Sequence, residues 1–207
     1  KQWQMEQGPL KNDFSKVFDP HQGIIRNRVI ASSKYSNVDF VDISIFYSGL
    51  GSWFNNKPHL IPKDGKKIDP SSYVSLEEIL MNLSKLSVLQ NINSITIYLD
   101  IKYINYSDAR QDYQYPELSK KICVLSSSSP SETSQEIDEM KHSIFSYFLL
   151  KGMKGDAIGD DNVLEIGELA EYLYRKIPEY TSKTDGVMLQ NPEFIGSDLK
   201  RVILDLK

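Results

Sequence analysis

Residues 40–52 have the sequence FVDISIFYSGLGS. Their apolar and β-branched residues are bunched closely enough to predict a strand that is buried on both faces. Residues 94–102, SITIYLDIK, have the same character. Both runs stop at polar or glycine-rich residues, and in an open α/β sheet ligands bind just beyond the carboxyl ends of the strands. Leu50 and Lys102 therefore mark the expected position of an active site.

Strand and helix patterns alternate along the remaining chain. Ser75 and Glu78 have the spacing of a capping box, and they precede an apolar face over residues 76–89 that predicts a helix. Further expected elements are helices at residues 14–18, 142–153 and 164–177 (ended by Pro178), strands at residues 24–31, 121–126, 187–189 and 201–206, and a loop at residues 52–57. This alternation predicts an α/β fold with a mostly parallel sheet that has helices on both faces.

The composition is that of a soluble globular protein. Hydrophobic residues make up 40% of the 207 residues and charged residues 25%, so the chain can bury a sizeable core. The net charge of −4 provides no field that would attract nucleic acid, and no run reaches the ~18 apolar residues of a membrane span. The polar start at residues 1–6 does not resemble a signal peptide. The single cysteine, Cys123, excludes an internal disulfide and leaves the compartment open, with the cytoplasm slightly favoured.

The order of these segments resembles that of the caspase, metacaspase and paracaspase group of cysteine peptidases, over about residues 24–198. Residues 45–51 (IFYSGLG) are similar to the family's strand that ends in Tyr-Ser-Gly-His-Gly. Residues 98–102 (YLDIK) are similar to its strand that ends in Leu-Asp-Ala-Cys. Other similar segments are residues 60–64, 141–152, 167–172 and 191–196. The resemblance implies a caspase-like three-layer sandwich for residues 23–207, preceded by an N-terminal arm at residues 1–22.

The resemblance also implies a His–Cys dyad, and this chain departs from it at both positions. The family's chemistry needs a thiolate nucleophile and an imidazole that activates it. The matching residues here are Leu50 and Lys102. We expect the remaining cleft to be lined by Ser48, Gly49, Gly51, Asp100, Ser126 and Ser127.

Asp100 matches an aspartate that, in the metacaspase branch, lines a pocket for basic substrate side chains. Asp100 and Lys102 are two residues apart on a strand, so their side chains share a face. We therefore expect Lys102 to pair with Asp100 or to fill the pocket itself.

No other residues rebuild a catalytic pair in the sequence. Cys123 stands between Ile122 and Val124, where a buried, inert thiol is the expected state. His59 and His142 are expected to have packing roles, and His21 has no partner in sequence. Neither a Ser-His-Asp order nor the His-x-x-x-His spacing of a metal site occurs.

An acidic stretch before the last helix resembles a calcium loop in part. Asp161 and Glu168 fall at ligand positions, but Ala157 and Gly159 stand where oxygen ligands are required. A solvated acidic turn is the expected structure, and we expect neither a metal nor another cofactor.

The central strand with which the family's sheet begins is missing. Residues 1–23 contain no convincing apolar strand, so this strand lies in a preceding part of the polypeptide or in another chain, or the arm replaces it. A sheet without its central strand exposes unpaired edges. We therefore expect a protein partner or a preceding segment to complete the sheet, and an active caspase-like relative is one candidate partner.

Three functions remain open. The first is a catalytically inactive caspase-like domain, a pseudopeptidase, that acts as a binding, regulatory or structural partner. The second is an active cysteine endopeptidase with a displaced dyad. The third is a structural module of a larger assembly.

Overall fold

The structure, a computed structural model, describes residues 8–35, 39–105, 113–159 and 161–205. In these residues the chain forms an α/β protein with a six-stranded sheet in the order β3-β2-β1-β4-β5-β9. The strands of this sheet are β1 (Val41–Phe54), β2 (Lys57–Leu60), β3 (Val74–Ser75), β4 (Ile92–Tyr103), β5 (Ile122–Ser126) and β9 (Glu193–Ile195). Two small two-stranded ladders pair β6 (Glu136–Ile137) with β7 (His142–Ser143), and β8 (Val163–Glu165) with β10 (Val202–Asp205).

The centre of the sheet is parallel, and its margins are antiparallel. β1, β4 and β5 run parallel, whereas β2, β3 and β9 join by antiparallel pairing. The sheet is therefore mixed, where the sequence predicted a mostly parallel one. β4 is buried along nearly its whole length because it has a strand on each side and helices over both faces.

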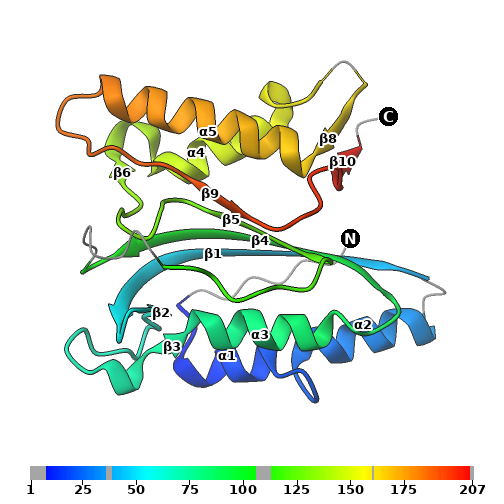
Figure 1. The fold of residues 1–207 in the computed structure, drawn as a ribbon. Helices are drawn as coiled ribbons and strands as arrows, with labels where there is room; N and C mark the ends of the chain where they lie inside the picture. Colours follow the sequence, from blue (N-terminus) through cyan, green and yellow to red (C-terminus); the bar gives the residue numbers. More distant parts are fainter. Residues whose placement is uncertain (1–7, 36–38, 106–112, 160, 206–207) are drawn as a thin grey trace.

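Helices form a layer on each side of the sheet (Figure 1). One layer holds α1 (Lys11–Phe18), α2 (Ile24–Tyr35) and α3 (Leu76–Leu86), and the other holds α4 (Ile144–Lys151) and α5 (Ile166–Lys183). The predicted cap of α3 is confirmed, because the Ser75 hydroxyl accepts a hydrogen bond from the Glu78 amide at 3.3 Å. Among the described residues, no helix is both long and apolar enough to cross a membrane.

Residues 24–31 form part of a helix, not the predicted strand. α2 runs from Ile24 to Tyr35, with Val29 buried and Ile25 packed against the same core. These two side chains are four residues apart, which places them on one face of a helix. The strand prediction was wrong because the apolar residues Ile24, Ile25, Val29 and Ile30 suit a strand locally, and packing against the sheet selects the helical spacing.

The arm at residues 1–22 contains α1, which packs against the sheet. Phe14 is buried, and its ring lies 6.4 Å from that of Phe18 and 6.2 Å from that of Tyr47 on β1. The predicted helix at residues 14–18 is therefore confirmed as part of a longer one.

The predicted loop at residues 52–57 is a tight hairpin. β1 continues to Phe54 and turns through Asn55 and Asn56 into β2. Both asparagines have positive φ angles, 50° and 56°, as in a type I′ turn, and asparagine tolerates this region better than most residues. Leu50 therefore lies within a strand and not at a strand end.

The last third of the chain holds two corrections. α5 continues through Pro178 to Lys183, since the buried residues Ile177 and Thr181 anchor the helix on both sides of the proline. Residues 187–189 are not a strand; instead Glu193–Ile195 forms β9 beside β5. Among the described residues, 3₁₀ turns occur at η1 (Pro70–Ser72) and η3 (Asp138–Met140), and a π-helical turn η4 (Gly152–Asp156) follows α4.

Candidate functional site

Leu50 and Lys102 lie side by side on adjacent parallel strands. They are direct partners in the β1–β4 ladder, as are Ser48 and Asp100, so the four residues lie together near the carboxyl end of β4, while β1 continues beyond them to Phe54. Neighbouring strands are about 4.8 Å apart, and register partners project to the same face. The side chains of these two positions, Leu50 and Lys102, are therefore close enough to touch.

Lys102 does not pair with Asp100. Its Nζ lies 3.9 Å from a Glu136 oxygen, and both side chains are more than half exposed. A pair in this setting contributes about 0–1 kcal/mol of stability. The expected ion pair is thus wrong, because Asp100 is buried and Lys102, two residues later, has already reached solvent.

Asp100 is held by three hydroxyl groups. It is 3% exposed and accepts hydrogen bonds from Ser134 and Ser146, each at 2.5 Å, and from Ser143. Ser143 also caps α4, so the carboxylate lies at the positive end of that helix. The serines occupy the acceptor positions that a basic ligand would need, so Asp100 is closed off by hydroxyls and not by Lys102.

The glycines beside Leu50 lie in close contact with neighbouring side chains. A Cβ on Gly51 would lie 2.4 Å from Cγ2 of Ile101, and one on Gly49 would lie 2.7 Å from the Tyr47 hydroxyl. That hydroxyl donates to the Leu50 carbonyl at 3.2 Å. Packing therefore accounts for both glycines without a catalytic role.

Ser126 and Ser127 are part of the fold rather than the wall of an open cleft. Ser126 is 1% exposed, and its hydroxyl donates to the Ser128 carbonyl. Ser127 is fully buried; its amide donates to the Leu99 carbonyl, and its hydroxyl accepts from the Ile101 amide. Ser48, by contrast, is exposed on β1.

Cys123 and the histidines form no second catalytic pair. Cys123 is fully buried on β5, and burial raises the pKa of its thiol. His59 lies on β2, and β1 and β4 stand between these two strands. At about 4.8 Å per strand, the backbones are roughly 14 Å apart. His142 and His21 are exposed and lie on other segments.

Two carboxylates that the sequence did not single out lie beside the strand ends. Glu193 on β9 pairs with Ser126 on β5, and burial together with the nearby charge of Glu132 raises the pKa of Glu193 to about 7. Glu132 itself accepts hydrogen bonds from the backbone and side-chain nitrogens of Asn191, both at 2.6 Å. The local sequence signal for this site was the short apolar pair Phe194–Ile195. It indicates a strand, but it does not indicate that this strand pairs with β5.

Within the described part of the chain, no three metal-ligating side chains cluster. Of the two residues that fit a calcium loop, Glu168 accepts a hydrogen bond from the Glu165 amide at 2.9 Å and Asp161 accepts one from the Val163 amide at 3.0 Å. These contacts shape the turn into α5.

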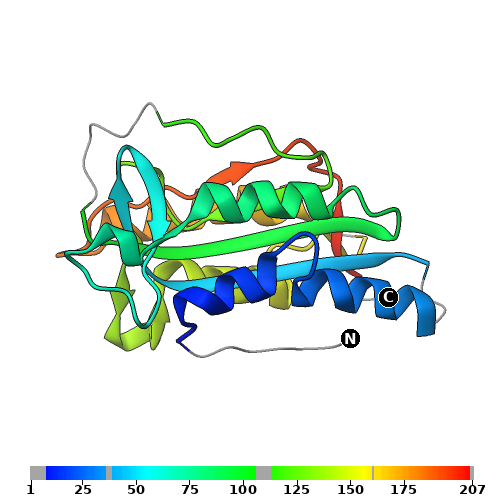
Figure 2. The ribbon, with the colours of Figure 1, turned by 90° about the horizontal axis from the view of Figure 1, so that it is seen from below.

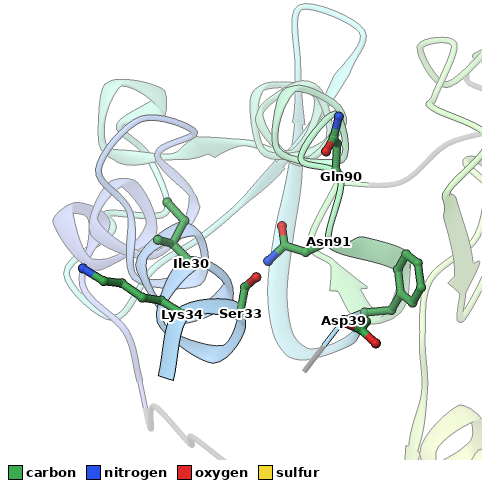
Figure 3. A pocket seen from close by; sticks show the side chains of 7 residues that line it. Ile30, Ser33, Lys34, Asp39, Gln90 and Asn91 are labelled. Atoms are coloured by element: carbon green, nitrogen blue, oxygen red, sulfur yellow. The ribbon is translucent and has the colours of Figure 1, made fainter. Parts of the chain in front are cut away.

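A hollow of about 620 Å³ lies at the amino end of β1, at the opposite end of the strand from Leu50 (Figure 3). Ser33 of α2 points toward Asn91 across it, and the remaining lining residues are Ile30, Lys34, Asp39, Phe40 and Gln90. The described lining has neither a thiol nor an imidazole, so the hollow offers no peptidase chemistry.

Comparison of the sequence with known proteins gave no match to any protein-family model and none to a curated protein.

Proposed function

We propose that this chain is a catalytically inactive caspase-like domain, a pseudopeptidase, that acts by binding another protein. One observation carries the proposal: the two positions that resemble the family's dyad are register partners, and they hold Leu50 and Lys102. Leucine can neither accept nor donate a proton, and an exposed lysine paired with Glu136 does not replace a thiolate.

The surroundings of the site support the same conclusion. The carboxylate that would recognise a basic substrate side chain, Asp100, is occupied by three serine hydroxyls. The one cysteine of the chain is buried in the core with a raised thiol pKa, and a buried thiol is a poor nucleophile. The surface around Leu50 and Lys102 can therefore contact another protein, but it offers no catalytic pair that could cleave a peptide bond.

The first test is peptide cleavage by the purified natural chain. Fluorogenic peptides with basic or acidic residues before the reporter group should be hydrolysed no faster than in buffer, and an electrophilic thiol probe should leave Cys123 unlabelled at neutral pH. Hydrolysis that disappears with Cys123→Ala or His59→Ala would show an active peptidase with a displaced dyad and would overturn the proposal.

A second test asks whether positions 50 and 102 meet as a dyad would. In Leu50→His combined with Lys102→Cys, the imidazole should lower the pKa of the new thiol and raise its alkylation rate at pH 7 about 10-fold over Lys102→Cys alone. Leu50→Asn with Lys102→Cys is the matched control, and mass spectrometry separates the new thiol from Cys123. Equal rates in all three variants would show that the two positions do not correspond to a dyad.

A further inference from the structure

In the part of the chain that the structure describes, β1 has a free edge along most of its length. On one side, β4 pairs with residues 41–51 of β1. On the other side, β2 covers only Gly51–Phe54, and among the described residues no strand pairs with residues 41–50 on that side. Figure 2 shows this margin of the sheet, with α1 and α2 running along it.

The pairing pattern identifies the backbone groups that face outward. The Val41 amide donates to the Asn91 carbonyl and the Gly51 carbonyl accepts from the Ile104 amide, so odd-numbered residues of β1 face β4. Even-numbered residues face the free edge, and at its far end the Leu50 carbonyl already accepts from the Ile61 amide at 2.9 Å. The unpaired groups therefore belong to Asp42, Ser44, Phe46 and Ser48.

The part of β1 that carries these groups, residues 42–48, is seven residues long and spans about 23 Å at ~3.3 Å per residue. A long, straight edge of this kind is a template for adding a strand, whose main chain supplies the hydrogen bonds. The site therefore accepts an extended segment of roughly seven residues.

The side chains around the edge call for alternating apolar residues in that segment. Ile43, Ile45 and Tyr47 project toward the α1–α2 layer and pack on its core, yet remain only partly buried. On the opposite face, Phe46 is 54% exposed. An added strand would place one set of alternate side chains over the α1–α2 layer and would leave the other set beside Phe46.

The charge around the edge selects acidic partners. Residues 11–35 carry five basic and two acidic residues, a net +3 in a chain whose total is −4, and Asp39 and Asp42 at the start of β1 reduce the local sum to +1. Lys16 pairs with Asp13, whereas no ion pair joins Arg26, Arg28 or Lys34 to an acidic group in the described residues. The helical layer that runs along the β1 margin is thus a basic part of an acidic protein, and it favours a segment that carries Asp or Glu.

We propose that the free edge of β1 binds an extended segment of a different polypeptide, with apolar side chains at alternate positions and acidic residues at its ends. This inference rests on the proposed binding function and names its surface and the chemistry of its partner. The segment joins the sheet as a seventh strand through the outward groups of Asp42, Ser44, Phe46 and Ser48.

Synthetic peptides test the proposal with the full chain. The probe is a fluorescent nonapeptide Glu-Glu-Val-Thr-Val-Thr-Val-Glu-Glu, and its controls are the rearranged peptide Glu-Glu-Thr-Thr-Val-Val-Val-Glu-Glu and the probe with Lys at every Glu. Fluorescence anisotropy should give the probe at least about 10-fold tighter binding than either control, and the difference from the Lys peptide should shrink in high salt. Amide hydrogen exchange should slow at Ser44, Phe46 and Ser48.

Two perturbations locate the binding on the edge. Ser44→Pro removes one outward amide donor without touching the β1–β4 ladder and should weaken binding about 10-fold, while Ser44→Ala, which keeps that donor, should bind like the natural chain. Circular dichroism checks that the proline variant folds. N-methylation of alternate probe residues gives the same information on the natural chain, because only one of the two alternating sets should abolish binding.

Each contrary result overturns the inference. Equal binding of all three peptides, slowed exchange away from β1, or dimers in sedimentation with slowed exchange at β1 would each show that the edge does not take an acidic segment of another polypeptide. If the probe fails to bind while peptide cleavage is also absent, the inference fails and the proposed inactive domain stands. Cleavage of peptides would instead contradict the proposed function.

Discussion

Asp100 shows how a single residue sets the character of the carboxyl end of β4. A buried carboxylate is costly unless its oxygens are hydrogen-bonded, and Ser134, Ser143 and Ser146 supply three donors. These hydroxyls come from the loop after β5 and from the start of α4, so the carboxylate ties both to the sheet. The group that resembles a recognition residue acts here as a structural one.

Removing this carboxylate should destabilise the fold. Asp100→Ala leaves three hydroxyls around an empty acceptor position and should lower the free energy of unfolding by about 3 kcal/mol, measured by urea denaturation. Ser48→Ala, at the exposed register partner on β1, is the matched control and should change it by less than about 0.5 kcal/mol. A loss below about 1 kcal/mol for Asp100→Ala would contradict the structural role.

Glu193 should make stability depend on pH. Its pKa is about 7 in the folded chain against an ordinary 4.5, so the folded state holds a proton that the unfolded state has lost. Stability should therefore fall as the pH rises from about 4.5 to about 7. In thermal unfolding, Glu193→Gln should flatten this fall and should melt higher than the natural chain at pH 8. Parallel melting curves across that range would refute the assignment, and Glu136→Gln, at an exposed carboxylate, is the control.

At the scale of elements, the β1–β2 hairpin sets the limit of the free edge. Its two-residue turn fixes the register that pairs Gly51 with Leu60, and Ile61 then covers the Leu50 carbonyl. The turn holds two asparagines at positive φ, where glycine in the second position is the preferred residue. The hairpin thus carries a small amount of strain that a substitution can release.

Asn56→Gly should stabilise the chain by about 0.5–1 kcal/mol, because glycine adopts the φ of 56° without a steric cost. Asn56→Val should destabilise it by about 1–3 kcal/mol for the opposite reason. Guanidinium denaturation of the three proteins measures both changes. Similar stabilities would show that the turn does not hold the type I′ geometry.

The sequence predicted helices and strands correctly where the local pattern was strong. It failed where tertiary packing determined whether a segment formed a helix or a strand. The strands around residues 40–47 and 94–101 and the Ser75 cap were predicted correctly. α2 and the passage of α5 through Pro178 were not, since a short apolar run has no unique periodicity and a proline is tolerated when buried neighbours hold the helix. β9 was missed because its strand pairing with β5 is about 70 residues distant in sequence.

At the scale of the whole molecule, two apolar cores stabilise the two faces of the sheet unequally. The α1–α3 core reaches under β1, β4 and β5, while the α4–α5 core contacts β4 and β5 through Tyr98, Cys123 and Leu125. The α4–α5 face of β1 therefore stays open, with Phe46 more than half exposed. The sheet is covered in its centre and accessible at its β1 margin.

This arrangement predicts an alternating pattern of hydrogen exchange along β1 in the free chain. The amides of Ile43, Ile45 and Tyr47, bonded to β4, should exchange at least about 100-fold more slowly than those of Ser44, Phe46 and Ser48. Nuclear magnetic resonance measures each amide, and residues 95–99 of β4, which are paired on both sides, serve as the internal control. Uniformly slow exchange would show that a strand already covers the edge.

The sequence by itself determined the central strands, the cap of α3 and the identities of Leu50 and Lys102, because these depend on neighbours a few residues apart. The tertiary structure decided the partners of those residues. It placed Asp100 among serines 34 to 46 residues away, paired Lys102 with Glu136, and brought Glu193 beside Ser126. Among the described residues it also left one edge of β1 without a partner strand. These outcomes depend on which segments pack together across the sheet, and no local pattern of residues encodes that choice.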